Sequence, residues 1–286
     1  MAALSDALCL AIVAGAIAAS LWAMLSSRRR PPATSPSGGS PPYAVDAAAA
    51  SIGSGASGMW RSRWSGVRPA WLLASRAAAV VALAGVLLWD AMTYDLTIMV
   101  YYTEWTFMLE IVYFVIDESI VRLSDSLMEI NHGADQKGGA GLNQLGRFMQ
   151  IVYQVLGGAV VLTDVVFWAL IVPFMYSSHF SLNAVMGCIH SFNLVFLLIE
   201  TTLNSLEFPW FRMTYFVLWT CSYVIIQWVV HVCGLTWWPY PFLNPAAPWA
   251  PLWYFCIAVL HLACYTVYWA IGEMRCTKGV TTNSGQ

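Results

Sequence analysis

Charged residues are scarce in this chain. They make up only 10% of its 286 residues, whereas a soluble domain carries about 25%. Hydrophobic residues make up 59%, and the mean hydropathy is +0.64. A soluble protein of this composition would expose far too much apolar surface. The formal net charge of -2 offers no basic face that could neutralise phosphates, so no nucleic-acid partner is expected.

Strong local motifs are absent as well. The sequence has no Walker A loop, no GxSxG nucleophile elbow and no N-x-S/T glycosylation sequon. Its 7 cysteines are scattered and form no CxxC pair, so we expect reduced packing residues and neither a zinc site nor a disulfide framework. No metal ion and no organic cofactor is predicted.

Apolar segments long enough to cross a bilayer, which takes about 20 residues, divide the chain. They cover residues 7–25, 71–92, 98–119, 148–176, 184–204, 213–233 and 251–272. The first has no basic residue before it and Arg28, Arg29 and Arg30 after it, so it is predicted to be an anchor helix and not a secretory signal peptide. The predicted fold is all-α: a polytopic transmembrane helical bundle with a six-helix core and one N-terminal anchor helix.

The predicted organisation has four parts. Residues 1–26 form the anchor helix, 27–70 a disordered cytosolic linker, 71–272 the six-helix transmembrane core, and 273–286 a cytosolic tail. The linker is assigned from its Pro, Ser, Gly and Ala content, because it lacks the large apolar residues that offset the entropy of ordering.

The positive charges predict the orientation. All 13 Lys and Arg residues lie in, or next to, every second gap between the apolar segments, which places those gaps and the C-terminus in the cytosol. Arg76, near a helix end, is expected to snorkel to the surface. An aromatic girdle is expected at the outer surface, formed by Trp237, Trp238, Tyr240, Phe242, Trp249, Trp253 and Tyr254. The expected location is the endoplasmic reticulum and endomembrane system, or the plasma membrane.

Polar and ionisable residues lie inside these segments, where they are costly and tend to face the bundle interior. They are Thr103 and Glu110 in the third segment, Asp164 in the fourth, His190 and Glu200 in the fifth, His231 in the sixth and His261 in the seventh. Thr103 and His190 lie about 8 Å and about 10 Å below the outer end, at 1.5 Å of rise per residue. Asp164 and His231 also fall in the outer half.

These residue types allow two interpretations. A hydroxyl nucleophile needs an adjacent base, and the base needs an orienting partner, which a threonine, histidines and an aspartate at matching depth would supply. The same side chains are typical of hydrogen bonds between packed membrane helices, and Glu200 is equally suited to pairing with a basic loop residue.

Four segments in series resemble a known family, the androgen-induced and androgen-dependent group of multi-pass lipid hydrolases, with the rolling stone-like proteins as relatives. The segments are YYTEWTFMLEIVYFVI, GGAVVLTDVVFW, IHSFNLVFLLIET and WVVHVCGLTWWPYPFL. Together they cover about residues 72–272 in the family's order. The residues of these segments are most similar to those of plant members of the rolling stone-like branch. The first apolar segment and the linker lie outside the resemblance, and the loop after His231 looks two residues longer.

The resemblance implies hydrolysis of fatty-acid esters of hydroxy fatty acids, with Thr103 as nucleophile and His190 as base. The expected partners are membrane lipids and a lipid ester substrate. Supporting roles would fall to Asp164, His231, Glu110, Glu200 and His261. Two alternatives stay open. Rolling stone-like proteins suggest a non-enzymatic membrane scaffold or fusion factor, and Glu110, Asp164, His190 and Glu200 would suit a proton-coupled transporter.

Overall fold

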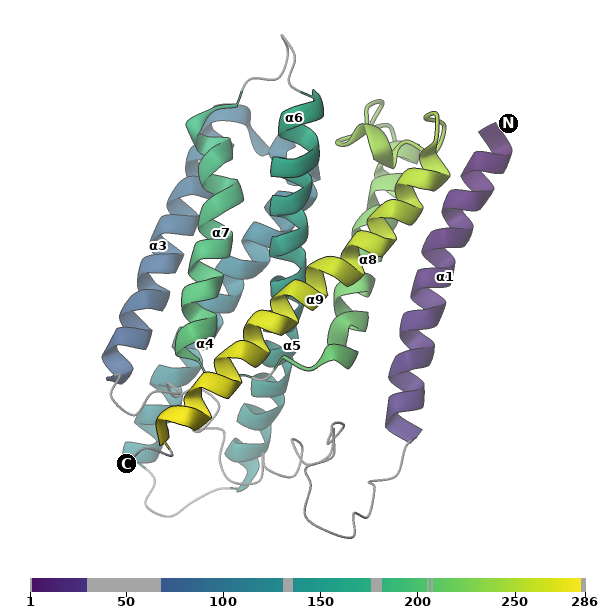
Figure 1. Ribbon diagram of the computed structural model, residues 1–286. Coiled ribbons are helices and arrows are strands. Elements are labelled where there is room, and N and C mark those ends of the chain that lie inside the picture. Colours follow the sequence, from purple (N-terminus) through teal and green to yellow (C-terminus); the bar gives the residue numbers. More distant parts are fainter. Residues whose placement is uncertain are drawn as a thin grey trace.

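The computed structural model describes residues 2–29, 68–130, 136–175, 182–204, 206 and 208–283, and in these residues it has helices and connecting segments but no β-strand. The α-helices are α1 (Ala2–Arg29), α3 (Pro69–Tyr94), α4 (Tyr102–Ile130), α5 (Gln136–Val166), α6 (Val172–Met175), α7 (Ala184–Leu203), α8 (Met213–Val232) and α9 (Ala250–Asn283) (Figure 1). Short 3₁₀ turns are η3 (Leu96–Val100), η5 (Trp210–Arg212) and η6 (Pro241–Leu243), and a π-helical turn, η4 (Phe167–Ile171), joins α5 to α6.

Six helices in this part of the chain are long and apolar enough to cross a membrane: α1, α3, α5 with its extension into α6, α7, α8 and α9. The predicted all-α, multi-pass membrane fold is confirmed. The segment 98–119 corresponds to α4, which is not among the six and carries Glu104, Glu110 and Asp117. This helix begins at Tyr102, because Asp95, with φ 61°, and the turn η3 intervene after α3.

Other predicted parts are described incompletely. Most of the predicted linker, residues 27–70, lies outside the described residues, so its predicted disorder stays a prediction. At the other end, α9 continues beyond residue 272 to Asn283, through the segment predicted to be a tail.

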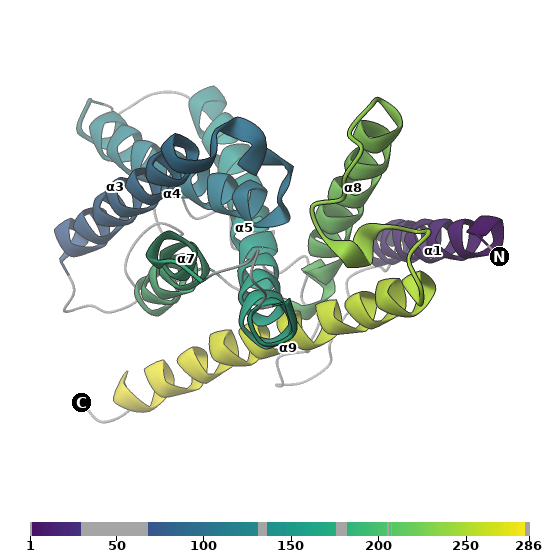
Figure 2. The same cartoon turned by 90° about the horizontal axis from the view of Figure 1, so that it is seen from above.

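Helix α5 lies at the centre of the bundle, in contact with α4, α7, α8 and α9. Its most apolar window is 67% buried, against 39% or less in the other five candidate spans. Seen from above, α3, α4 and α7 lie on one side of α5, and α1 and α8 lie on the other (Figure 2). Helix α9 runs obliquely across the bundle and contacts both α5 and α1.

Two adjacent glycines allow α8 and α9 to approach α5 closely. A Cβ atom at Gly157 would lie 2.5 Å from a ring carbon of Tyr268 on α9, and one at Gly158 would lie 2.5 Å from a ring carbon of Phe216 on α8. Both distances are below any ordinary carbon contact. Small residues at such crossings are how packed membrane helices gain close contact.

We therefore expect Gly158→Ala to destabilise the bundle by about 1–3 kcal/mol, the usual cost of overpacking a core. Gly187→Ala in α7 is the matched control, because a Cβ there would meet nothing within 4 Å. Alanine also favours a helix over glycine by about 1 kcal/mol. The midpoint of thermal unfolding in detergent should fall for the first variant and stay level or rise for the second. Equal midpoints would contradict the close approach of α8.

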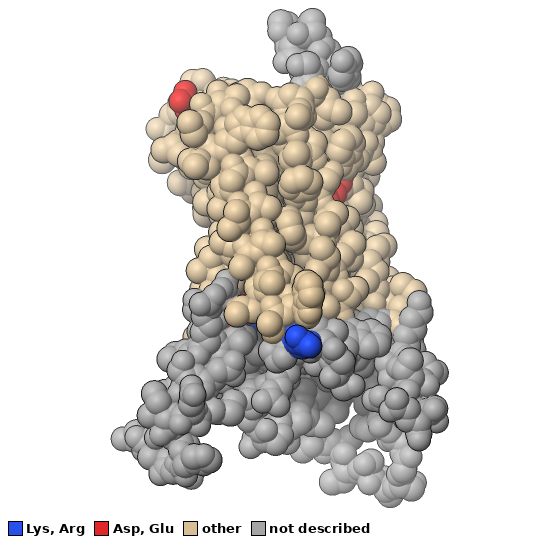
Figure 3. Space-filling model, turned by 90° about the vertical axis from the view of Figure 1, so that its left-hand side faces the viewer, with Lys and Arg blue, Asp and Glu red and all other residues tan. Residues whose placement is uncertain are grey.

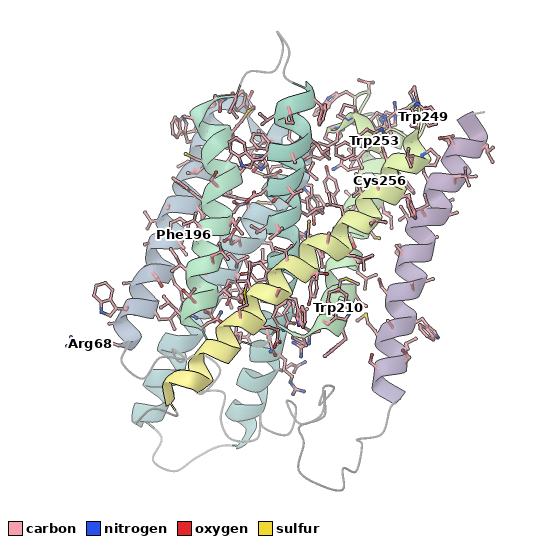
Figure 4. The ribbon with its side chains drawn as sticks, viewed as in Figure 1. Arg68, Phe196, Trp210, Trp249, Trp253 and Cys256 are labelled. Atoms are coloured by element: carbon pink, nitrogen blue, oxygen red, sulfur yellow. The ribbon has the colours of Figure 1, made fainter. Side chains whose placement is uncertain are left out.

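The two ends of the bundle differ in chemistry. Trp249 and Trp253 lie at the end where α9 begins, whereas Arg68 lies at the opposite end (Figure 4). The described face in Figure 3 is nearly free of charge, with acidic colour at its upper end and part-way down its right edge, and basic colour at its lower margin. The N-terminus lies at the aromatic end and the C-terminus at the basic end (Figure 1). This separation agrees with the predicted alternation of sides; which end faces the cytosol stays a prediction.

Candidate functional site

A cavity of about 610 Å³ lies at the aromatic end of the bundle. It is lined by residues of α3, α4, α5, η4, α7, α8 and α9, and by the segment between α8 and α9, which folds back and contributes Trp237 and residues 239–243. Most of the lining side chains are aromatic or aliphatic, and a few are polar. Size and lining are typical of small-molecule and cofactor sites, which measure about 300–1,000 Å³.

Thr103 and His190, the two residues singled out by the resemblance, both line this cavity. Thr103 is the second residue of α4 and His190 the seventh of α7, and both side chains are buried. No hydrogen bond between them is present in the described structure. The two helices therefore bring the predicted nucleophile and base to the wall of one cavity without a hydrogen bond between them.

The backbone at His190 is distorted. Its φ of -91° and ψ of 25° are not helical and interrupt α7, in the sparsely populated region where many active-site residues lie. The carbonyl oxygen of His190 accepts a hydrogen bond from Trp168 Nε1 at 2.8 Å. The N–H of Leu194, four residues on, donates to the Asn193 side chain at 2.8 Å. Side chains thus satisfy the backbone groups around the kink.

The π turn η4 is a second backbone irregularity, and it lies opposite the kink at His190. The π turn η4 carries Phe167 and Trp168, and the Phe167 ring stacks on the His190 imidazole with centroids 3.7 Å apart and planes 9° apart. One residue on, Trp168 provides the bond to the His190 carbonyl. Such π turns inside α-helices occur frequently at functional sites. Both distortions serve to hold one imidazole ring at the cavity wall.

Asp164, one turn before η4, lies beside the same ring. Its Oδ1 is 3.8 Å from His190 Nδ1 and accepts a hydrogen bond from Asn193 Nδ2 at 3.1 Å. The first distance is too long for a hydrogen bond, and Nδ1 has no hydrogen-bond partner among the described residues. The carboxyl group is nevertheless placed to stabilise a protonated imidazole, as the third member of a triad does.

Tyr240, in the segment that closes the cavity, lies next to Thr103. Burial raises the pKa of the Tyr240 phenol, and the neighbouring Thr103 side chain and backbone oppose that rise. Thr103 is in the first turn of α4, where backbone N–H groups lack helical partners. A phenol and free N–H donors beside a hydroxyl can together stabilise an oxyanion that forms there.

Four other predicted residues lie elsewhere. Glu110 is fully buried and does not line the cavity, and neither of its oxygens has a hydrogen-bond partner in the described part of the chain. His231 stacks on Trp238 at 4.2 Å, outside the cavity lining. His261 lines a neighbouring cavity, and Glu200 belongs to an ion cluster.

That ion cluster corrects the prediction for Arg76 and bears on the alternative left open for Glu200. Arg76 is only 1% exposed and does not snorkel; it points into the bundle. Its Nε donates to Glu200 Oε2 at 3.0 Å, and its Nη2 lies 2.7 Å from both Glu200 Oε1 and Asp117 Oδ2. Tyr113 and Asn204 also donate to Glu200 Oε1. Glu200 therefore pairs with a helix residue and not with a loop residue, since burial demands a partner for both charges.

A threonine–histidine contact that the sequence did not reveal joins α8 to α9. Thr220 Oγ1 lies 2.9 Å from His261 Nε2, and His261 Nδ1 lies 2.6 Å from the carbonyl of Ile257. A carbonyl only accepts, so Nδ1 carries the proton and Nε2 accepts from Thr220. Tyr102 OH lies 2.9 Å from the same threonine oxygen. The only signal in the sequence was that both residues fall near the middle of neighbouring apolar segments, one running outward and one running inward.

Thr220 stands between two cavities. The second, of about 380 Å³, is lined mainly by apolar residues of α1, α8 and α9. Five residues line both cavities and form a shared wall: Thr220, Val224, Phe242, Leu243 and Ile257.

Asp90 and Glu104 were also missed by the sequence reasoning. They line the first cavity and are only 4% and 5% exposed. A carboxyl group within or at the edge of an apolar segment is a signal for a functional site that the sequence does contain.

Comparisons with protein-family models, with curated proteins and with solved structures find no match. Function is therefore inferred from the cavity and its side chains.

Proposed function

We propose that this chain is an integral-membrane threonine hydrolase that cleaves lipid esters, of the kind in which a fatty acid is joined to a hydroxy fatty acid. One observation carries the proposal: Thr103 and His190 line a single cavity, and the backbone of His190 is distorted there by a kink and an opposing π turn. The resemblance to multi-pass lipid hydrolases supports it with the same two residues.

In the proposed reaction the Thr103 hydroxyl oxygen attacks the ester carbonyl carbon, and its proton passes to Nε2 of His190. The Asp164 carboxylate near Nδ1 stabilises the imidazolium that forms. The Tyr240 hydroxyl stabilises the oxyanion. The carbon–oxygen bond to the alcohol then breaks, and the alkoxide takes the proton from His190. Water, activated by the same histidine, hydrolyses the acyl-threonine.

The step from the observed geometry to this reaction requires an approach of two side chains. Thr103 and His190 are not hydrogen bonded in the structure, and catalytic hydrogen bonds are often long until substrate is bound. The stack with Phe167 fixes the imidazole plane. When an ester enters and displaces the Thr103 side chain from Tyr240, a change in the Thr103 rotamer would bring its hydroxyl into hydrogen-bond reach of His190.

Both cavities suit a substrate with apolar chains. The second cavity is apolar and shares a wall with the first, so it offers room for an acyl chain next to the reacting carbonyl. Membrane lipids would reach it laterally. The proposal includes a location in the endomembrane system or the plasma membrane and a cytosolic C-terminus. It also includes entry of the lipid ester from the outer leaflet.

The test is labelling with a fluorophosphonate probe in native membranes. Wild type is expected to be labelled, and Thr103→Ala and His190→Ala are expected to lose labelling at matched expression. Thr266→Ala is the control, because this exposed threonine on α9 hydrogen bonds only its own helix, at Leu262. Folded wild type that stays unlabelled would favour the scaffold or fusion-factor alternative.

The transporter alternative loses one of its predicted members. Its relay used Glu110, Asp164, His190 and Glu200, but Glu200 is bound to Arg76 in a separate buried cluster.

A further inference from the structure

Two carboxyl groups in the cavity have no counter-charge. Asp90 on α3 and Glu104 on α4 are both buried and both line it. Glu104 Oε2 has no hydrogen-bond partner, and neither carboxyl group is paired with a base among the described residues. The two groups also act on each other electrostatically. Two carboxyl groups without a basic partner thus line the same, largely apolar cavity.

This pair differs from the other buried carboxyl groups that carry a charge partner. Asp117 and Glu200 share Arg76, and Asp164 is bonded by Asn193 and lies beside His190. Buried charges are paired in proteins because removing an ion from water is expensive. At Asp90 and Glu104 the described part of the protein provides no basic partner, and both residues line the cavity. A cation that enters the cavity would supply that partner.

The chemistry of the surroundings favours an organic cation over a metal ion. Within the described residues there is no group of three His, Cys, Asp or Glu side chains that could hold a metal. Aromatic rings line the same cavity instead, among them Tyr94, Tyr101 and Trp237, and Tyr101 and Trp237 pack with ring centroids 6.2 Å apart. Aromatic faces with carboxylates are the usual receptors for ammonium groups.

We propose that Asp90 and Glu104, with these rings, form a subsite for an organic ammonium group. Binding of an ammonium group at this subsite does not depend on the proposed hydrolase function. The inference that the ammonium group belongs to the substrate does rest on that function. In that case the preferred ester carries a cationic headgroup. This narrows the proposed lipid-ester substrates to esters with a cationic group, in place of the hydroxy-fatty-acid esters with a free carboxylate that the resemblance implies.

The experiment measures binding to the purified full-length chain in a nonionic detergent, with hexanoylcholine as the cationic probe. Its neutral isostere is 3,3-dimethylbutyl hexanoate, in which carbon replaces the quaternary nitrogen. Titration is done on Thr103→Ala, so that turnover does not consume the probe, and followed by tryptophan fluorescence. We expect the cationic ester to bind at least about tenfold more tightly than its isostere. Choline alone is titrated in the same way. Weak but measurable binding of choline would show that the headgroup itself is recognised.

The variants Asp90→Asn, Glu104→Gln and their combination are expected to remove this preference. Asp95→Asn is the matched control, because Asp95 is exposed at the same end of α3 and does not line the cavity. Neutralising unpaired buried acids should leave the unfolding midpoint unchanged or higher, and either single variant serves if the double variant folds poorly. Equal binding of the two esters, or an undiminished preference in the folded variants, would overturn the proposal.

The outcomes separate the two proposals. Selective binding of hexanoylcholine without hydrolysis by wild type would keep the ammonium subsite and refute the hydrolase. Hydrolysis of both esters at equal efficiency would keep the hydrolase and refute the subsite.

Discussion

Replacing Arg76 with methionine is expected to destabilise the bundle by roughly 3–5 kcal/mol, the cost of leaving one side of a buried ion pair without its partner. Arg76, Asp117 and Glu200 are each no more than 1% exposed. The guanidinium joins α3 to both α4 and α7, with contacts of 2.7 Å to each carboxyl group. Its removal would leave two carboxyl groups buried together, and the three helices would lose their shared link.

The measurement is the free energy of unfolding in mixed micelles. Arg68→Met is the matched control, because Arg68 is exposed next to the start of α3 and should change stability by less than about 0.5 kcal/mol. A variant with Asp117→Asn and Glu200→Gln added to Arg76→Met should recover much of the loss, since no charge is then buried. If Arg76→Met proves as stable as Arg68→Met, the cluster does not hold these helices together.

The sequence predicted the membrane helices well because length and apolar composition determine them directly. For α1, α3, α5, α7, α8 and α9 the predicted segments correspond to helices long enough to span. It placed the start of α4 too early. Asp95 adopts a positive φ and η3 follows, and no residue pattern around Leu96 distinguishes a 3₁₀ turn from a continuing helix.

The site was predictable in part. Depth along two inward-running helices brought Thr103 and His190 to the same level, and the structure places both at one cavity. Depth alone says nothing of rotation about a helix axis, which is why Arg76 was expected at the surface and lies inside. The kink at His190 and the π turn at Phe167 depend on tertiary contacts, such as the bond from Trp168, that a sequence does not show.

The largest kinetic effect is expected at Thr103 and His190. If the proposed reaction is right, Thr103→Ala and His190→Ala should each lower kcat for ester hydrolysis by at least about 10³-fold, because nucleophile and base act as a unit. KM should change little, since neither group supplies much apolar contact. Asp164→Asn should lower kcat less, because Asp164 acts only through the imidazole and no hydrogen bond joins them.

Thr220 and His261 provide the decisive comparison, because they already make the contact that a nucleophile and base require, at 2.9 Å. Thr220 also bonds Tyr102, and His261 bonds Ile257, so this group links α4, α8 and α9. If it is structural, Thr220→Ala and His261→Ala will lower the unfolding midpoint while kcat of the folded fraction stays within a few-fold of wild type. If instead these two variants lose kcat and the Thr103 and His190 variants keep it, the nucleophile is Thr220, and the reacting carbonyl lies at the wall between the two cavities.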